Sequence, residues 1–119
     1  MEKTLIGLVE HVKLNGNTDE SEEIIARIDT GATNSAIDLR LASKLKLGPV
    51  IMSKLVKSTH GTKLRPVIEA EIELCGHKIA EQFTLADRSH MKYMVLIGQN
   101  ILKKGIFLID PMKEKGAKK

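Results

Sequence analysis

Apolar and polar residues alternate most regularly over residues 68–74, where an apolar residue stands at every even position and a glutamate at every odd one. This period of two predicts a strand with one buried face and one solvated face. Cys75-Gly76 marks a turn into a further strand over residues 77–85. Upstream, residues 50–74 divide into two strands around a polar loop at 58–62.

Shorter apolar runs predict additional strands within residues 4–14, 24–28, 94–97 and 106–109. The first of these runs is long enough for one or two strands, and the polar segment 15–23 that follows it predicts a loop. The strand over 24–28 ends directly at Asp29. A short helical turn fits residues 99–104, with Gly105 at its end.

Residues 35–49 hold the best helix candidate. Asp38 can cap it, Leu39, Ala42 and Leu45 recur at helical spacing, and Gly48-Pro49 stops it. Many short strands with one or two short helices predict a mainly β domain, in the form of a small closed or partly open barrel.

Composition fits one folded domain. The chain has 119 residues, of which 42 % are hydrophobic and only 3 % are aromatic. The core must therefore come from Ile, Leu, Val and Met, and modules that stack nucleic-acid bases on exposed aromatic rings are disfavoured. Part of the net charge of +4 lies in residues 113–119, which predict a basic flexible tail after a domain over 1–112. We expect no nucleic-acid partner.

Cysteine content and hydropathy indicate a cytoplasmic protein without a membrane partner. The single cysteine, Cys75, cannot form an intrachain disulfide. The apolar run near Met1 is too short for a signal peptide, and no run approaches the roughly 20 apolar residues that cross a bilayer.

Metal, thiol and phosphate sites find little support. The four histidines are dispersed, and Cys75-Gly76-His77 supplies two donors where a zinc site needs three or four. Neighbouring side chains on a turn seldom align for proton transfer, and no Gly-rich phosphate loop is present. We expect no metal and no cofactor.

Asp29-Thr30-Gly31 allows two interpretations. In the first, Asp29 caps a turn, and Thr30 and Gly31 belong to that turn. In the second, Asp29 is a catalytic acid. The order of features along the chain favours the second interpretation: a strand leads into the tripeptide, small residues follow it, a hairpin comes next, and an apolar pair before Gly98 closes the set.

A catalytic acid of this kind needs a partner. Two neighbouring carboxylates cannot both ionise easily, so one keeps a proton and donates it to the substrate carbonyl while the other activates water. The chain holds one such motif. The partner must then come from a second copy, and a twofold homodimer with Asp29 on its axis supplies it.

The sequence resembles the retropepsin-like aspartic proteases. "IDTGATNSAI" is similar to their catalytic loop, "VLIGQNILKKGIFLID" to their last strand–helix–strand segment, and "IELCGHKI" to the strands after the flap. "ARIDTGA" and "LADRSHMKYMVLIGQNIL" fit a cellular branch often labelled "ATP-dependent zinc protease". The resemblance covers most of the chain, from about Leu5 to Pro111.

This resemblance implies an acid-protease barrel with one lobe per chain, acting as a homodimeric aspartic endopeptidase on a peptide or protein. Asp29 would be catalytic, within an active-site loop that also includes Thr30, Gly31 and Ala32. Thr30 would make the interlocking contact between subunits. The implied flap residues are His60 and Gly61, and the residues that support the loop are Leu96, Ile97 and Gly98.

The same branch is associated with ligases that add glutamate, which hints at glutamate-modified substrates. Arg65, Arg88 and Lys92 are candidate partners for acidic groups, although solvated surface cations are the simpler interpretation of each. One departure concerns Gln99, which stands where the family usually has an arginine that ties the subunit together. A non-catalytic module that binds a peptide or partner on the same fold remains the alternative, and a zinc hydrolase is a weaker one.

Overall fold

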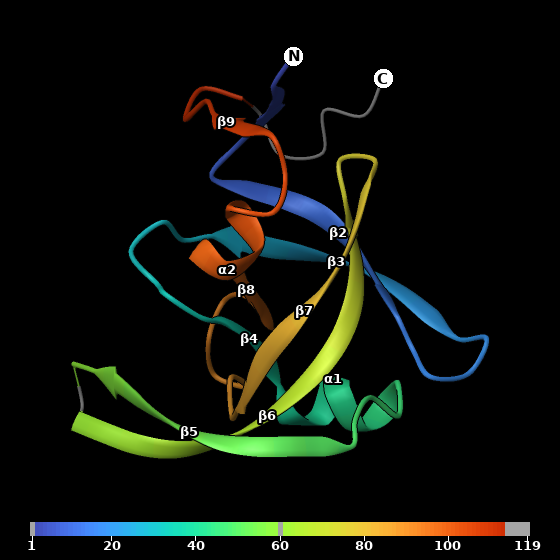
Figure 1. Ribbon diagram of the computed structural model, residues 1–119, viewed down its shortest axis with the longest axis vertical. Helices are drawn as coiled ribbons and strands as arrows, with labels where there is room; N and C mark the ends of the chain where they lie inside the picture. Colours follow the sequence, from blue (N-terminus) through green and yellow to red (C-terminus); the bar gives the residue numbers. More distant parts are fainter. Residues whose placement is uncertain (1, 60, 114–119) are drawn as a thin grey trace.

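Six strands close into a barrel in the structure, a computed structural model that describes residues 2–59 and 61–113 (Figure 1). Around the barrel the order is β2-β3-β8-β4-β7-β6, and β6 pairs with β2 to complete the ring. The bounds are Val9–Asn15 (β2), Ser21–Ile28 (β3), Ser35–Asp38 (β4), Gly61–Leu74 (β6), His77–Ala86 (β7) and Val95–Ile97 (β8). The expected mainly β barrel is confirmed, and it is closed.

A two-stranded arm extends from the barrel. Strand β5 (Val50–Ser58) pairs with the first half of β6, from Ser58 opposite Gly61 to Val50 opposite Ile68. The arm projects at the lower left of Figure 1, away from the ring. It is the hairpin that the sequence predicts as a flap, but His60 at its turn lies outside the described residues.

The core follows the predicted alternation of β6. Its even positions from Ile68 to Leu74 are at most 8 % exposed, while the glutamates between them face outward. Burial of each large aliphatic side chain contributes about 1.5–3 kcal/mol to folding. The largest side chains buried in the core are Phe83, Ile6, Leu14, Ile37, Leu45, Ile68, Ile72, Leu74, Ile97 and Ile101.

Helix α1 (Leu39–Lys44) begins where predicted, because the Asp38 carboxylate accepts a hydrogen bond from the Arg40 backbone N–H at 3.0 Å. The segment before it corrects the prediction. Ser35–Asp38, included in the helix candidate, forms strand β4 because its backbone pairs with β7 and β8 on either side. Leu39, predicted on the apolar face of the helix, is 44 % exposed.

The two ends of the described chain meet in a separate parallel pair, β1 (Thr4–Ile6) with β9 (Phe107–Ile109). Helix α2 (Gln99–Leu102) is shorter than the predicted turn over 99–104.

Lys113 lies against the folded domain. Its Nζ is 2.7 Å from Oε2 of Glu10, a carboxylate that also accepts the Gly7 N–H at 2.7 Å. Glu10 is only 6 % exposed, so this ion pair satisfies a buried charge. The remainder of the predicted basic tail, residues 114–119, lies outside the described residues.

Candidate active site

Asp29 stands at the end of β3, where the chain leaves the barrel and crosses over the end of β8 to enter β4. Its backbone N–H donates to the Ile97 carbonyl at 2.8 Å, which continues the parallel pairing of β3 with β8. Its carboxylate Oδ1 accepts the Gly31 N–H at 3.0 Å. Strand pairing and a tight local turn thus fix both the backbone and one oxygen of the carboxylate.

The loop from Asp29 to Asn34 rests on Gly98. A Cβ added at Gly98 would collide with the carbonyl of Asn34 and come within 2.8 Å of the Ala32 carbonyl oxygen. Only glycine lets the two backbone segments approach so closely. The structure therefore brings the predicted supporting residues Ile97 and Gly98 directly against the loop, while Leu96 faces the cleft described below.

A buried polar network holds the same junction. The Ser35 hydroxyl accepts the Gly98 N–H at 2.9 Å and donates to Oδ1 of Asn100 at 2.7 Å. Asn100 in turn donates from Nδ2 to the Gln82 carbonyl at 2.9 Å. Sequence reasoning missed Ser35 and Asn100, because only the fold brings residues from β4, α2 and β7 together.

Gln99 also contacts the loop. Its backbone N–H donates to the Ala32 carbonyl at 2.8 Å, and its side-chain Nε2 donates to the Thr30 carbonyl at 2.8 Å. The residue that replaces the expected arginine therefore still ties α2 to the Asp29–Asn34 loop, through a neutral amide.

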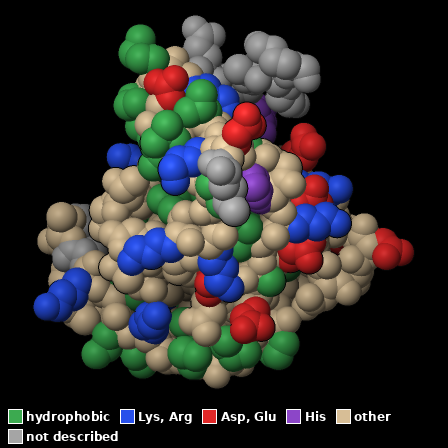
Figure 2. Space-filling model, turned by 45° about the horizontal axis from the view of Figure 1, so that its top comes forward, with side chains coloured by type: hydrophobic (Ala, Val, Ile, Leu, Met, Phe, Trp, Pro, Cys, Tyr) green, Lys and Arg blue, Asp and Glu red, His purple; other side chains and the backbone are tan. Residues whose placement is uncertain are grey.

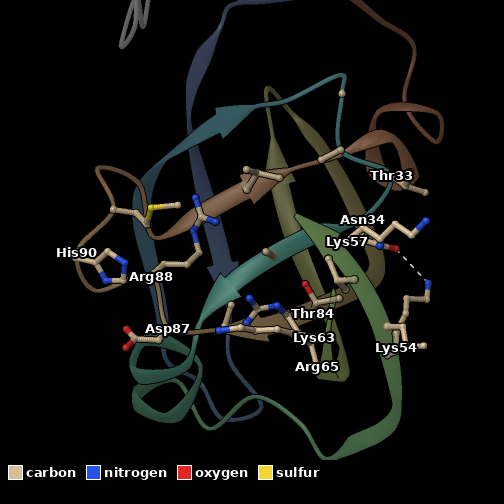
Figure 3. A pocket seen from close by; sticks show the side chains of 18 residues that line it. Thr33, Asn34, Lys54, Lys57, Lys63, Arg65, Thr84, Asp87, Arg88 and His90 are labelled. Carbon is tan, nitrogen blue, oxygen red and sulfur yellow. Dashed lines mark hydrogen bonds between the residues drawn. The ribbon is translucent and has the colours of Figure 1, made fainter. Parts of the chain in front are cut away.

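A cleft of about 980 Å³ opens beside this loop, between the arm and the segment after β7 (Figure 3). Gly31, Ala32 and Leu96 contribute to its wall, as do five Lys and Arg side chains against one acid, Asp87. These cationic residues are Lys54, Lys57, Lys63, Arg65 and Arg88. Figure 3 shows Lys63 and Arg65 extending from β6 into the cleft, with Arg88 on another wall.

Arg88 is held in place by its own segment. Its backbone N–H donates to Asp38 Oδ1 at 2.6 Å, and its Nε donates to the Tyr93 carbonyl at 2.9 Å. Partial burial lowers the pKa of the Arg88 guanidinium, Asp38 opposes that shift, and the neighbouring cations Arg27 and Arg65 lower the pKa further. Arg27 and Arg65 thus act on Arg88 electrostatically, and the Asp29 carboxylate, like that of Asp38, acts in the opposite direction.

Arg65 and Arg88, which the sequence offers as candidate partners for acidic groups, both line this cleft. The sequence analysis does not single out Lys54, Lys57, Lys63 or the nearby Arg27. The alternation of β5 and β6 could have signalled two of the lysines, because Lys54 opposite Arg65 and Val56 opposite Lys63 share one face of the arm. Lys54 Nζ donates to Asn34 Oδ1 at 3.1 Å, which links the arm to the loop.

Lys92, the third predicted cation, does not line the cleft. Its Nζ instead lies 5.6 Å from the centre of the Tyr93 ring.

Thr30 and Gly31 are both exposed, so a partner could reach them.

Metal donors do not cluster in the part of the chain that the structure describes. Among residues 2–59 and 61–113, no three side chains of His, Cys, Asp or Glu come close enough to hold one ion. This donor set does not fit the zinc ion implied by the branch label. Neither of the helices in those ranges has the length and apolar character needed to cross a bilayer.

Comparison with known proteins identifies one family. Residues 42–119 match the RimB-like family model, described as "Retropepsin-like aspartic endopeptidase RimB". The matched range begins after the Asp29 loop. No curated protein matches the chain.

Solved structures share the fold. Protein Lpg0085 of unknown function (DUF785) from Legionella pneumophila subsp. pneumophila str. Philadelphia 1 is similar over 98 % of this chain and 100 % of its own, with TM-score 0.68 and 18 % identity. The EIAV protease, in complex with the inhibitor HBY-793, is similar over 81 % of this chain and 85 % of its own, with TM-score 0.65 and 21 % identity. The foamy viral protease-reverse transcriptase matches 81 % of this chain with 12 % of its own, with TM-score 0.58 and 20 % identity.

Proposed function

The chain belongs to the RimB-like family of retropepsin-like aspartic endopeptidases, and from this premise we propose that it hydrolyses peptide bonds as a homodimer with one Asp29 from each subunit. The observation that carries the proposal is the placement of Asp29. It lies in a loop braced by β8 and α2, beside a cleft large enough for a peptide.

The proposed chemistry uses both carboxylates. One ionised Asp29 takes a proton from a water molecule, which attacks the carbonyl carbon of the scissile bond. The protonated Asp29 of the second subunit donates its proton to the carbonyl oxygen, which gives a gem-diol. When the C–N bond then breaks, the first Asp29 passes the proton taken from water to the leaving amine nitrogen. The second Asp29 takes a proton back from a gem-diol hydroxyl, so the pair returns to its starting state. Within the described residues, Gly31 N–H is the hydrogen-bond donor to the carboxylate of its own subunit, at Oδ1, which leaves Oδ2 to face water and the partner.

The substitution Asp29→Asn tests this proposal. It keeps the size of the side chain and removes the base, so peptide hydrolysis should be lost while the solution mass stays that of a dimer. A wild-type protein that is a dimer and binds peptides without cleaving them would favour the alternative, a binding module. A strictly monomeric protein that cleaves peptides would contradict the two-chain mechanism.

We propose further that the substrate is an acidic peptide, with glutamate-rich segments as the preferred class. The cationic residues of the cleft outnumber its one acid, Asp87, whose pKa is already lowered by hydrogen bonds from Ser89. Clefts lined by one sign of charge concentrate ligands of the opposite sign. Arg65 and Arg88 present guanidinium groups, which can bind carboxylates through two parallel hydrogen bonds.

Two peptides of equal length test substrate choice, one rich in glutamate and the other with glutamine at the same positions. We expect kcat/KM to be at least about tenfold higher for the glutamate peptide at low salt, and the advantage to shrink as ionic strength rises. Equal values for both peptides at low salt would contradict an acidic substrate but leave the peptidase proposal intact.

A further inference from the structure

Gln99 and Asp29 hydrogen bond to opposite sides of a single peptide group. The Gln99 Nε2 donates to the carbonyl oxygen of Thr30 at 2.8 Å. The N–H of the same peptide unit, which belongs to Gly31, donates to Asp29 Oδ1 at 3.0 Å. The helix residue is thereby connected to the carboxylate through one intervening amide.

A peptide group transmits orientation because it is planar. A donor that fixes the direction of the Thr30 carbonyl also fixes the direction of the Gly31 N–H on the opposite side. Hydrogen bonds in a chain polarise one another, so the bond at the carbonyl also strengthens the donor that faces Asp29. Without the amide of Gln99, this exposed turn would lose the one side-chain contact that holds its carbonyl among the described residues.

Gln99 is itself held firmly at the start of α2. Its backbone N–H donates to Ala32 O at 2.8 Å, and the adjacent Asn100 N–H donates to Thr33 O at 3.2 Å. Asn100 is anchored through Ser35 and the Gln82 carbonyl. The amide of Gln99 therefore projects from a helix start that is bonded to the loop and is also anchored, through Asn100, to β4 and β7.

We infer that Gln99 is a positioning residue, which orients the Asp29 carboxylate through the Thr30–Gly31 peptide. The consequence of this positioning for catalysis rests on the proposed function, whereas the effect of Gln99 on the orientation of the peptide group does not. The required property at this position is a hydrogen-bond donor, and positive charge is unnecessary. An arginine could satisfy the same requirement with a guanidinium N–H.

Two substitutions separate the donor from the shape of the side chain. Gln99→Met keeps an unbranched, neutral side chain of similar length and removes the donor. Gln99→Arg restores a donor. Gln82→Met makes the same chemical change on β7 and serves as the control. The contact between Gln82 and Asn100 uses the backbone carbonyl of Gln82, so this substitution retains it.

The first readout is the amide signal of Gly31 in the NMR spectrum of the dimer, which requires no substrate. In Gln99→Met, its proton signal should move upfield, as expected for a weakened bond to a carboxylate, and should return toward the wild-type position in Gln99→Arg. Gln82→Met should leave it unchanged. A Gly31 signal that is the same in Gln99→Met and in wild type would overturn the inference.

The second readout is peptide hydrolysis. In Gln99→Met, kcat should fall about tenfold, the effect of a modest displacement of a catalytic group, with KM within about twofold of wild type. Gln99→Arg should recover most of the loss. An equal loss in both variants would show a merely structural role. If the wild type hydrolyses no peptide, the proposed function fails, and the Gly31 signal still decides the inference about Gln99.

Discussion

Single residues decide how closely the Asp29–Asn34 loop can approach the barrel. Gly98 is the clearest case, because the carbonyl groups of Ala32 and Asn34 occupy the space that a side chain would need. Backbone hydrogen bonds fix the chain on both sides of this contact. The Asp29 N–H donates to the Ile97 carbonyl, and the Gln99 N–H donates to the Ala32 carbonyl. The backbone cannot relax without breaking one of these bonds.

Gly98→Ala should therefore lower the free energy of unfolding by about 2–3 kcal/mol, the range expected for overpacking, and displace the Asp29 loop. Urea unfolding measures the first effect. Gly76→Ala is the matched control, since its Cβ meets nothing within 4 Å and only its positive φ of 86° adds strain. A Gly98→Ala variant no less stable than Gly76→Ala would contradict the close approach.

The ion pair of Lys113 with Glu10 gives a second residue-scale prediction. Lys113→Met removes the cation from a carboxylate that is only 6 % exposed, so the free energy of unfolding should fall by about 2 kcal/mol even though the Gly7 N–H still donates to Glu10. Lys44→Met, which breaks the solvent-exposed pair with Glu22, should have no measurable effect.

The pH dependence of this pair has a definite sign. The hydrogen bond to Glu10 raises the pKa of Lys113 above its ordinary value of 10.5. The stabilisation is therefore fully present below pH 10.5 and is lost as the pH rises through the higher value of the folded state. The difference in stability between wild type and Lys113→Met should stay constant from neutral pH to about pH 9 and decrease above 10.5. A difference that vanished already at neutral pH would contradict the ion pair.

At the scale of elements, the β5–β6 arm supplies most of the positive charge of the cleft. Lys54, Lys63 and Arg65 share one face of the arm, while Leu55 and Leu64 form a cross-strand pair on the other face and are more than 60 % exposed. Leu55 and Lys57, on this second face, also line the cleft. The face that carries Lys54, Lys63 and Arg65 is the part of the arm best suited to an acidic chain.

Neutralising that face should weaken binding selectively. We expect the double variant Lys54→Gln/Lys63→Gln to raise KM for a glutamate-rich peptide by about fivefold to tenfold and to leave KM for its glutamine counterpart unchanged. Steady-state kinetics at low salt measure both. Lys78→Gln/Lys103→Gln removes the same charge outside the cleft and should match wild type. Equal effects of the two double variants would show that only net charge matters.

The elements also show how far the sequence could lead. Alternation predicts β6, the Cys75-Gly76 turn predicts β7 after it, and Asp38 predicts the start of α1, because these signals are local in sequence. The helix candidate includes Ser35–Asp38, because the extended conformation of this segment comes from pairing with β7 and β8, which no local pattern reveals. The contact of Gln99 with Thr30 was missed for the same reason: two residues far apart in the chain meet only after β8 has been inserted between β3 and β4.

At the scale of the whole molecule, the proposed function requires each barrel to supply one carboxylate and half of a binding site. Figure 2 shows Lys and Arg side chains on the side of the molecule that carries the arm, and acidic side chains gathered mainly on the opposite side. A peptide with acidic side chains would be drawn to the arm and the Asp29 loop and repelled from the other side.

The central claim is that the active site needs an Asp29 from each of two chains. Subunits of wild type and Asp29→Asn, mixed and allowed to exchange, test it most directly by peptide hydrolysis at constant total protein. If both carboxylates are required, mixed dimers are inactive and activity follows the square of the wild-type fraction, so an equal mixture retains about a quarter of full activity. Activity that falls in direct proportion to the wild-type fraction, with about half remaining in an equal mixture, would contradict the account.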